Sequence, residues 1–199
     1  MVGVCGTPGT GKKTVSPIVA KLMGLPAPIP INSLAPKGGA EVDTALLRRK
    51  LLDLDPPRAV LFGHLLPHVL RKSEAGFVAV LRCEPSVLRE RLVERGYPRA
   101  KVTENVEAEL IGVVLDECVR RFGSALAREY DTTSTSPQAV ASAIVRDAET
   151  AKASGRGAAS GRGAAAGARR VWIDWTLDYD SSTKLRSLLA GSRDPPAST

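Results

Sequence analysis

The glycine-rich stretch near the start of the chain limits its fold more than any other feature of the sequence. The stretch is Gly6–Lys12, and it directly follows the apolar run Met1–Cys5. In a phosphate-binding loop, backbone N–H groups surround a phosphate while a lysine reaches the outer phosphate oxygens. An ordinary Gly/Pro turn between a strand and a helix is the alternative. Because strand, loop, lysine and helix come in the required order, the sequence predicts nucleotide phosphate binding by Gly9, Gly11 and Lys12.

One position of this loop departs from the pattern. In G-x-x-x-x-G-K-[ST], the residue after the lysine is a serine or threonine whose hydroxyl binds Mg²⁺. Here Lys13 follows the lysine, and the hydroxyl comes one residue later, at Thr14. We therefore expect Lys13 and Thr14 beside the phosphates, with Thr14 as the candidate metal ligand. Whether the site binds Mg²⁺ stays open.

The composition is that of a soluble protein with one core. The chain has 199 residues, of which 43% are hydrophobic, enough for one domain with an appendage. Its cysteines, Cys5, Cys83 and Cys118, lie far apart and lack C-x-x-C spacing, which argues against a disulfide framework and a zinc site. No apolar run approaches the ~18 residues of a membrane span. We expect a cytoplasmic protein with no membrane partner.

Apolar runs alternate with segments of helical periodicity along the first 150 residues. This alternation predicts an α/β fold of the P-loop NTPase type, a parallel sheet with helices on both faces. Ligands of such sheets bind beyond the carboxyl ends of the strands. The expected strands are 1–5, a short proline-rich edge strand within 25–31, 59–62, 77–82 and 127–131, and the expected helices are 14–23, 41–53, 84–94, 104–122 and 137–148.

The sequence changes character after Thr150. The six residues Ser154–Ala159 are repeated as Ser160–Ala165, and their glycines, alanines and arginines cannot form a core. We expect a flexible linker over 151–170 that either contacts RNA or only connects. Residues 171–199 contain both tryptophans, and we expect this segment to dock back onto domain 1–150. The net charge of +7 suits an anionic partner, either a nucleotide or RNA, although a solvated basic surface is also compatible with it.

Residues 1–148 resemble the adenylate kinase 6 family of nucleoside monophosphate kinases. The loop, the stretch 59–67 and the run Arg91–Tyr97 carry the resemblance, and Ile173–Trp175 looks like the ending of archaeal members. Residues 95–109 look like the family's lid, at about 95–104, and the helix behind it. The resemblance implies ATP as phosphoryl donor and AMP or another nucleoside monophosphate as acceptor. It also implies a role in small-ribosomal-subunit maturation, with ribosomal protein uS11 and small-subunit pre-rRNA (16S) as partners.

The candidate lid contains an arginine pair. Phosphoryl transfer needs positive charge around the moving group, in a site that excludes water. Arg91 and Arg95 are four residues apart and share a helical face, and a mobile segment from Gly96 could bring Arg95 over the phosphates. The alternative is that the two arginines pair with Glu90 and Glu94 at the surface. We expect a catalytic role for Arg95 and leave Arg91 open.

The resemblance also shows where this chain departs from its family. The family's second core strand ends in an acidic residue, followed two residues later by histidine; here the two positions hold Phe62 and His64. His64 could orient water or a phosphate, or could be a packing histidine. Together with Lys13, Phe62 removes both protein groups expected near Mg²⁺. Asn32 and Asp43 are the candidates for holding the acceptor nucleotide.

These observations predict an ATP:nucleoside monophosphate phosphotransferase with ATPase activity, impaired at Lys13 and Phe62. Lys12, His64 and Arg95 are its expected catalytic residues. The competing prediction is a catalytically weak, nucleotide-dependent assembly factor that binds a ribosomal protein or rRNA.

Overall fold

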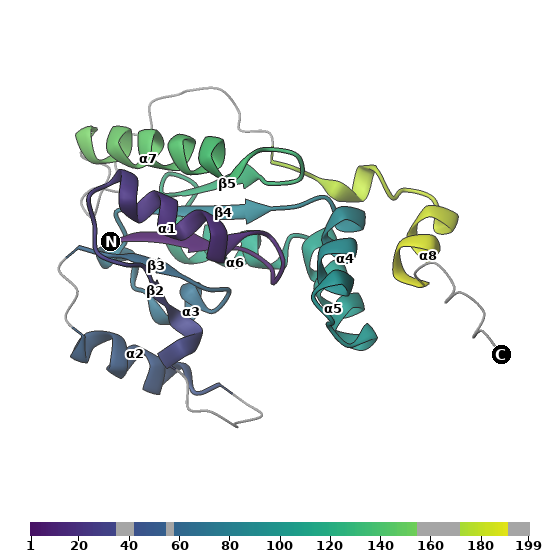
Figure 1. Cartoon of the computed structure of the whole chain (residues 1–199), viewed down its shortest axis with the longest axis horizontal. Coiled ribbons are helices and arrows are strands. Elements are labelled where there is room, and N and C mark those ends of the chain that lie inside the picture. Colours follow the sequence, from purple (N-terminus) through teal and green to yellow (C-terminus); the bar gives the residue numbers. More distant parts are fainter. Residues whose placement is uncertain (35–41, 55–57, 155–171, 191–199) are drawn as a thin grey trace.

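A five-stranded parallel sheet forms the centre of the protein. The structure is a computed structural model that describes residues 1–34, 42–54, 58–154 and 172–190. The strand order is β2-β3-β1-β4-β5, and all neighbouring strands are parallel (Figure 1). The strands are β1 (Val2–Cys5), β2 (Ile29–Pro30), β3 (Val60–Phe62), β4 (Phe77–Arg82) and β5 (Ala127–Asp131).

The sheet confirms the predicted α/β class. Strands β4 and β5 have the predicted bounds, and β1 and β3 each differ from them by one residue. The proline-rich strand lies at the sheet edge, as expected, but only Ile29 and Pro30 pair with β3. Proline cannot donate a backbone hydrogen bond to a neighbouring strand. It is tolerated in an edge strand because one side of that strand has no neighbour to receive such a bond.

Helices cover both faces of the sheet, as predicted. Apolar side chains of α1 and α7 pack on one face, and those of α2, α3 and α6 pack on the other. No helix in the described parts of the chain is long and apolar enough to cross a membrane. The helices are α1 (Lys12–Leu22), α2 (Thr44–Asp53), α3 (Leu66–Val69), α4 (Pro85–Glu94), α5 (Arg99–Leu110), α6 (Val113–Phe122), α7 (Pro137–Ala153) and α8 (Ser182–Ala190), with 3₁₀ turns η1 (Ile31–Leu34), η2 (Lys72–Glu74) and η3 (Trp175–Leu177).

The prediction of one helix over 104–122 is wrong. The chain forms α5 and α6 instead, separated at Gly112, whose φ of 69° lies in the left-handed region that glycine tolerates. Helix α5 begins at Arg99, so the second half of the candidate lid is helical. Helix α7 continues past the predicted end at 148 to Ala153. The rest of the predicted linker, from residue 155 on, lies outside the described residues.

The C-terminal segment lies against α4 and α5. Trp175 is buried in a cluster with residues of both helices, among them Leu88 and Val106, and Leu188 of α8 joins the same cluster. Figure 1 shows α4 and α5 side by side beyond the carboxyl ends of the strands, with α8 next to them. This arrangement agrees with the expectation that the tryptophan segment docks back.

Candidate phosphate-binding site

The loop between β1 and α1 has a shape that only glycine permits at two positions. Gly6 and Gly9 have φ values of 139° and 100°. A Cβ atom on Gly6 would lie 2.5 Å from the carbonyl oxygen of Leu81, and one on Gly9 would lie 2.5 Å from Leu88 Cδ1. The loop therefore bends tightly against β4 and α4, and α1 begins at Lys12, directly after it. A helix N-terminus after a glycine-rich loop offers unpaired N–H groups to an anion.

The Lys12 side chain folds back into this loop. Its Nζ atom donates hydrogen bonds to the carbonyl oxygens of Gly6, at 2.6 Å, and Thr7, at 2.8 Å. Burial lowers the pKa of Lys12 to about 8. Among the described residues, no carboxylate lies within salt-bridge distance of this ammonium group. The Gly6 and Thr7 carbonyl oxygens are neutral acceptors and compensate the charge of Lys12 only in part. A phosphate bound in the loop would supply a negatively charged partner.

A cavity of about 160 Å³ lies beside the loop, at the carboxyl ends of β1 and β5. Gly9, Gly11 and Thr14 form one wall, and Arg91 and Arg95 form another. The rest of the lining comes from the segment between β5 and α7, from α7 and from α1, with Thr132, Thr135, Pro137, Val140 and Val15. Lys13 and Thr14 are both exposed, but only Thr14 reaches the lining. The position is the one at which parallel α/β sheets bind ligands.

Arg91 is a structural residue of this cavity wall. Its Nη2 atom donates to the carbonyl oxygens of Thr132, at 2.8 Å, and Thr133, at 2.9 Å. Its Nη1 atom lies 3.2 Å from Cys83 Sγ. The guanidinium therefore holds the segment after β5 against α4, and its donors are largely used.

Arg95 differs from Arg91, although both line the cavity. It is exposed at the end of α4, followed by Gly96 with a φ of 71°. Its guanidinium has no hydrogen bond or ion pair with another described residue, and neither arginine pairs with Glu90 or Glu94. The surface-pair alternative is therefore wrong for both arginines, and Arg95 is available for a ligand.

His64 follows β3 near the same end of the sheet. Burial lowers the pKa of its imidazole, and the nearby positive charge of Lys12 lowers it further, so the ring is neutral at pH 7. The chain turns there at Gly63, whose carbonyl oxygen accepts a hydrogen bond from Cys5 Sγ at 3.1 Å. Phe62, at the end of β3, packs against the core cluster that includes α1. The structure thus brings His64 within the electrostatic reach of Lys12.

The two candidates for the acceptor nucleotide have different surroundings. Asn32 is exposed in η1, and a Cβ atom on Gly63 would lie 3.2 Å from its Oδ1 atom, so Asn32 lies beside the turn before His64. Asp43 caps α2: its Oδ1 atom accepts from the backbone N–H groups of Ala45 and Leu46, at 2.8 and 3.0 Å. Capping accounts for Asp43 without a ligand, whereas Asn32 stays a candidate.

Several known proteins are similar to this chain in amino-acid sequence. A protein-family model described as an AAA domain matches residues 2–112. A protein from Natronomonas pharaonis named "Putative adenylate kinase" is 42% identical over 161 residues, which are 77% of this chain and 94% of that protein. The chain belongs to the archaeal-type putative adenylate kinase family. A protein of the same name from Thermococcus onnurineus is 35% identical over 190 residues, 90% of this chain and 93% of that protein.

Glu109 supports the phosphate-binding loop, a role that the sequence did not lead us to predict. Glu109 of α5 is 1% exposed, and its Oε2 atom accepts a hydrogen bond from Thr7 Oγ1 in the loop at 2.5 Å. Its Oε1 atom accepts from Arg82 Nε at 2.7 Å and from the backbone N–H of Cys83 at 3.0 Å. The signal was available: Glu109 is the one acidic residue on the buried side of α5, beside Val102, Val106 and Leu110.

Arg82 extends this buried contact to the C-terminal segment. Its Nη1 atom lies 3.2 Å from Glu129 Oε2 and 3.3 Å from the carbonyl oxygen of Ile173. The N–H of Ile173 in turn donates to Glu129 Oε1 at 2.6 Å. A continuous polar network therefore runs from Ile173 through Glu129, Arg82 and Glu109 to the phosphate loop.

The described residues at this site offer few protein ligands for a Mg²⁺ ion. Within the described ranges, no group of three or more His, Cys, Asp or Glu side chains is placed to bind a metal. Glu109 is already bonded to Thr7 and Arg82. Lys13 and Phe62 occupy the positions where the loop pattern and the family resemblance lead us to expect a hydroxyl and a carboxylate. Of the expected ligands, only Thr14 is present.

Proposed function

We propose that this protein binds ATP at the phosphate loop and transfers the γ-phosphoryl group to AMP or another nucleoside monophosphate, or to water when no acceptor is bound. The observation that carries the proposal is the cavity between the loop glycines and Arg95, because Arg95 has no partner among the described residues. Family membership supports it, since the relatives carry the name of an adenylate kinase.

The loop side of the cavity would bind the phosphates of ATP. The N–H groups of the loop and of the first turn of α1 point toward an anion at the helix start. Lys12 would exchange its bonds to the Gly6 and Thr7 carbonyl oxygens for bonds to phosphate oxygens. Charged acceptors make the stronger hydrogen bonds, so this exchange favours binding.

Arg95 and His64 would act at the transferring group. Arg95 would move from the end of α4 over the phosphates and stabilise the charge of the transition state. His64, neutral at pH 7, would orient the acceptor or a water molecule through its ring nitrogens. The protein thus contributes position and charge, which are the main requirements of phosphoryl transfer.

Parallel measurement of ADP and of free phosphate tests the proposal. Transfer to AMP yields two ADP for each ATP consumed and no phosphate, whereas hydrolysis yields equal amounts of ADP and phosphate. We expect ADP formation to rise when AMP is added and phosphate release to fall. If ADP forms in neither case, the proposed reaction is wrong; if AMP changes nothing, transfer to AMP is wrong.

ATP affinity should fall as the pH rises above 8. Lys12 has a pKa of about 8 in the free protein, and a bound phosphate favours its charged form, so binding above that pH requires proton uptake. Affinity should be nearly constant below pH 8 and should then fall about tenfold per pH unit. Isothermal titration calorimetry across this range measures the effect. Lys12→Arg, which keeps its charge throughout, is the control, and an equal fall in that variant would contradict the assignment to Lys12.

Placing a hydroxyl at position 13 and a carboxylate at position 62 should raise the rate of ATP turnover in the presence of Mg²⁺. In the double variant Lys13→Thr with Phe62→Asp, we expect an increase of about tenfold, a fraction of what a bound metal ion can contribute. The rate is measured over a series of Mg²⁺ concentrations. The control, Lys13→Ala with Phe62→Ala, removes the same side chains without adding oxygen ligands. Equal rates in both double variants would show that the metal does not limit turnover.

A nucleotide-dependent assembly factor is the second candidate. Lys13 and Phe62 favour it, because both replace groups that would support catalysis. Ribosomal protein uS11 and small-subunit pre-rRNA are the partners that the resemblance implies, and both stay predictions. Binding of purified uS11, measured with ATP, with ADP and without nucleotide, tests this candidate. A nucleotide-dependent affinity without ATP turnover would favour it over the kinase, and no binding would count against it.

A further inference from the structure

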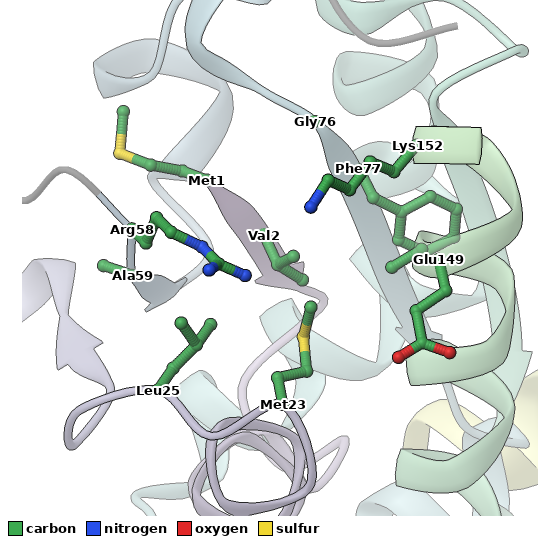
Figure 2. A pocket seen from close by; sticks show the side chains of 11 residues that line it. Met1, Val2, Met23, Leu25, Arg58, Ala59, Gly76, Phe77, Glu149 and Lys152 are labelled. Atoms are coloured by element: carbon green, nitrogen blue, oxygen red, sulfur yellow. The ribbon is translucent and has the colours of Figure 1, made fainter. Parts of the chain in front are cut away.

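A second cavity lies at the amino-terminal end of the sheet, opposite the phosphate loop. Its volume is about 350 Å³, and residues at the starts of β1, β3 and β4 line it together with the ends of α1 and α7 (Figure 2). We propose that this cavity binds a small organic anion with a compact, apolar body. The proposal is independent of the phosphate site, because none of the residues that the structure describes lines both cavities.

The floor of the cavity is apolar. Val2 and Phe77 are buried at the starts of β1 and β4, and Met23 and Leu25 continue the apolar surface after α1. The volume lies within the range of about 300–1,000 Å³ that is usual for small-molecule sites. Such sites combine an apolar lining with a few polar groups that orient the ligand. The floor thus suits a ring or another compact apolar group.

Two cations lie at the rim on opposite sides. Figure 2 shows the Arg58 guanidinium extending from the start of β3 and the Lys152 ammonium extending from α7, both toward the space over Val2. Both residues are exposed, and neither has a hydrogen bond or salt bridge to another described side chain. Glu149, the remaining charged side chain of the lining, directs its carboxylate away from the Lys152 ammonium in Figure 2. The excess of positive charge selects an anion.

Helix α1 separates this cavity from the phosphate loop. The helix begins at Lys12 and has 11 residues, and Met23 is its C-terminal cap. At a rise of 1.5 Å per residue, the two ends lie about 16 Å apart. A ligand at Met23 therefore cannot touch the loop, and ATP bound at the loop should not displace it.

The fluorescent probe 8-anilinonaphthalene-1-sulfonate (ANS) has the proposed chemistry, an aromatic body with one anionic group. We titrate the full chain with ANS at saturating ATP, so that the phosphate site is blocked. Arg58→Glu and Lys152→Glu should each weaken ANS binding about tenfold, because each change replaces attraction by repulsion. Arg120→Glu on α6 makes the same change of charge at an exposed position, with 80% of the side chain accessible, and should leave ANS binding unchanged.

A cavity-filling variant checks the site without changing its charge. Leu25→Trp places an indole over the apolar floor and should abolish ANS binding while circular dichroism shows an unchanged fold. The proposal is wrong if Arg58→Glu and Lys152→Glu bind ANS as tightly as the natural chain. It is also wrong if Arg120→Glu weakens binding equally, or if ANS binds in a parallel titration without ATP but not at saturating ATP. The readout is binding, so loss of the kinase reaction would leave the result interpretable.

Discussion

Replacing Lys12 by alanine should reduce ATP turnover by about 10²–10³-fold, the effect of removing one preorganised charge from a phosphoryl or oxyanion site. The Lys12 ammonium lies within the loop and bonds to the Gly6 and Thr7 carbonyl oxygens. Without it, the phosphates would keep the backbone N–H groups near the loop and Arg95 across the cavity, because the Arg91 guanidinium is already bonded to the Thr132 and Thr133 carbonyl oxygens. Initial rates of ADP formation at saturating ATP measure the effect on chemistry, and calorimetry measures the effect on ATP binding.

Lys13→Ala is the matched control for this experiment. It removes the same charge one residue later, but Lys13 is exposed and does not line the cavity. We expect its rate to stay within a few-fold of the natural chain, since an exposed charge is screened by water and salt. Equal losses in the two variants would mean that the rate follows total charge near α1 instead of the position of Lys12. An unchanged rate in Lys12→Ala would exclude the loop from the reaction.

The sequence predicted the loop and the central strands because both are encoded locally. A phosphate loop needs glycine at fixed positions, and the φ values of Gly6 and Gly9 explain why. Strands β1 and β4 are buried along their whole length, so each is read from a continuous apolar run, which in β4 extends as far as Arg82. Neither feature depends on knowing which distant residues lie nearby.

The break between α5 and α6 depends on such distant residues. The carbonyl oxygen of Glu109 accepts a hydrogen bond from Arg82 Nη2 at 3.1 Å, and the same guanidinium lies beside Gly112. Gly112 alone, within a segment of helical apolar periodicity, did not predict a turn. The side chain that lies beside it, Arg82, belongs to β4 and is distant in the sequence. The helical periodicity of the sequence continues through Gly112, although the tertiary structure ends α5 just before it.

The roles of Arg91 and Arg95 could not be distinguished for the same reason. Both lie on one face of α4, and helical spacing treats them as equivalent. Arg91 donates hydrogen bonds to the carbonyl oxygens of Thr132 and Thr133, about forty positions away in the sequence. Only the folded structure leaves Arg95 as the arginine that is available to a ligand.

Glu109→Ala should lower the free energy of unfolding by about 3–5 kcal/mol, the effect of removing one partner of a buried ion pair. The side chains of Arg82 and Glu109 are each 2% exposed, and the loss would leave the Arg82 guanidinium short of its nearest carboxylate. The Thr7 hydroxyl, bonded to Glu109 at 2.5 Å, would lose its acceptor as well. Urea denaturation measures the change in stability. ATP affinity should also fall, because Thr7 no longer fixes the loop from behind.

Two further variants separate the ion pair from the positioning of the loop. Glu104→Ala removes an exposed carboxylate of the same helix, paired with Lys101 at 2.7 Å, and should change stability by less than about 1 kcal/mol. Arg82→Met with Glu109→Leu replaces the pair by apolar side chains and should recover part of the lost stability. This double variant still lacks the acceptor for Thr7. If its stability returns while its ATP affinity stays low, Glu109 positions the loop; if both return together, Glu109 acts only through the stability of the fold.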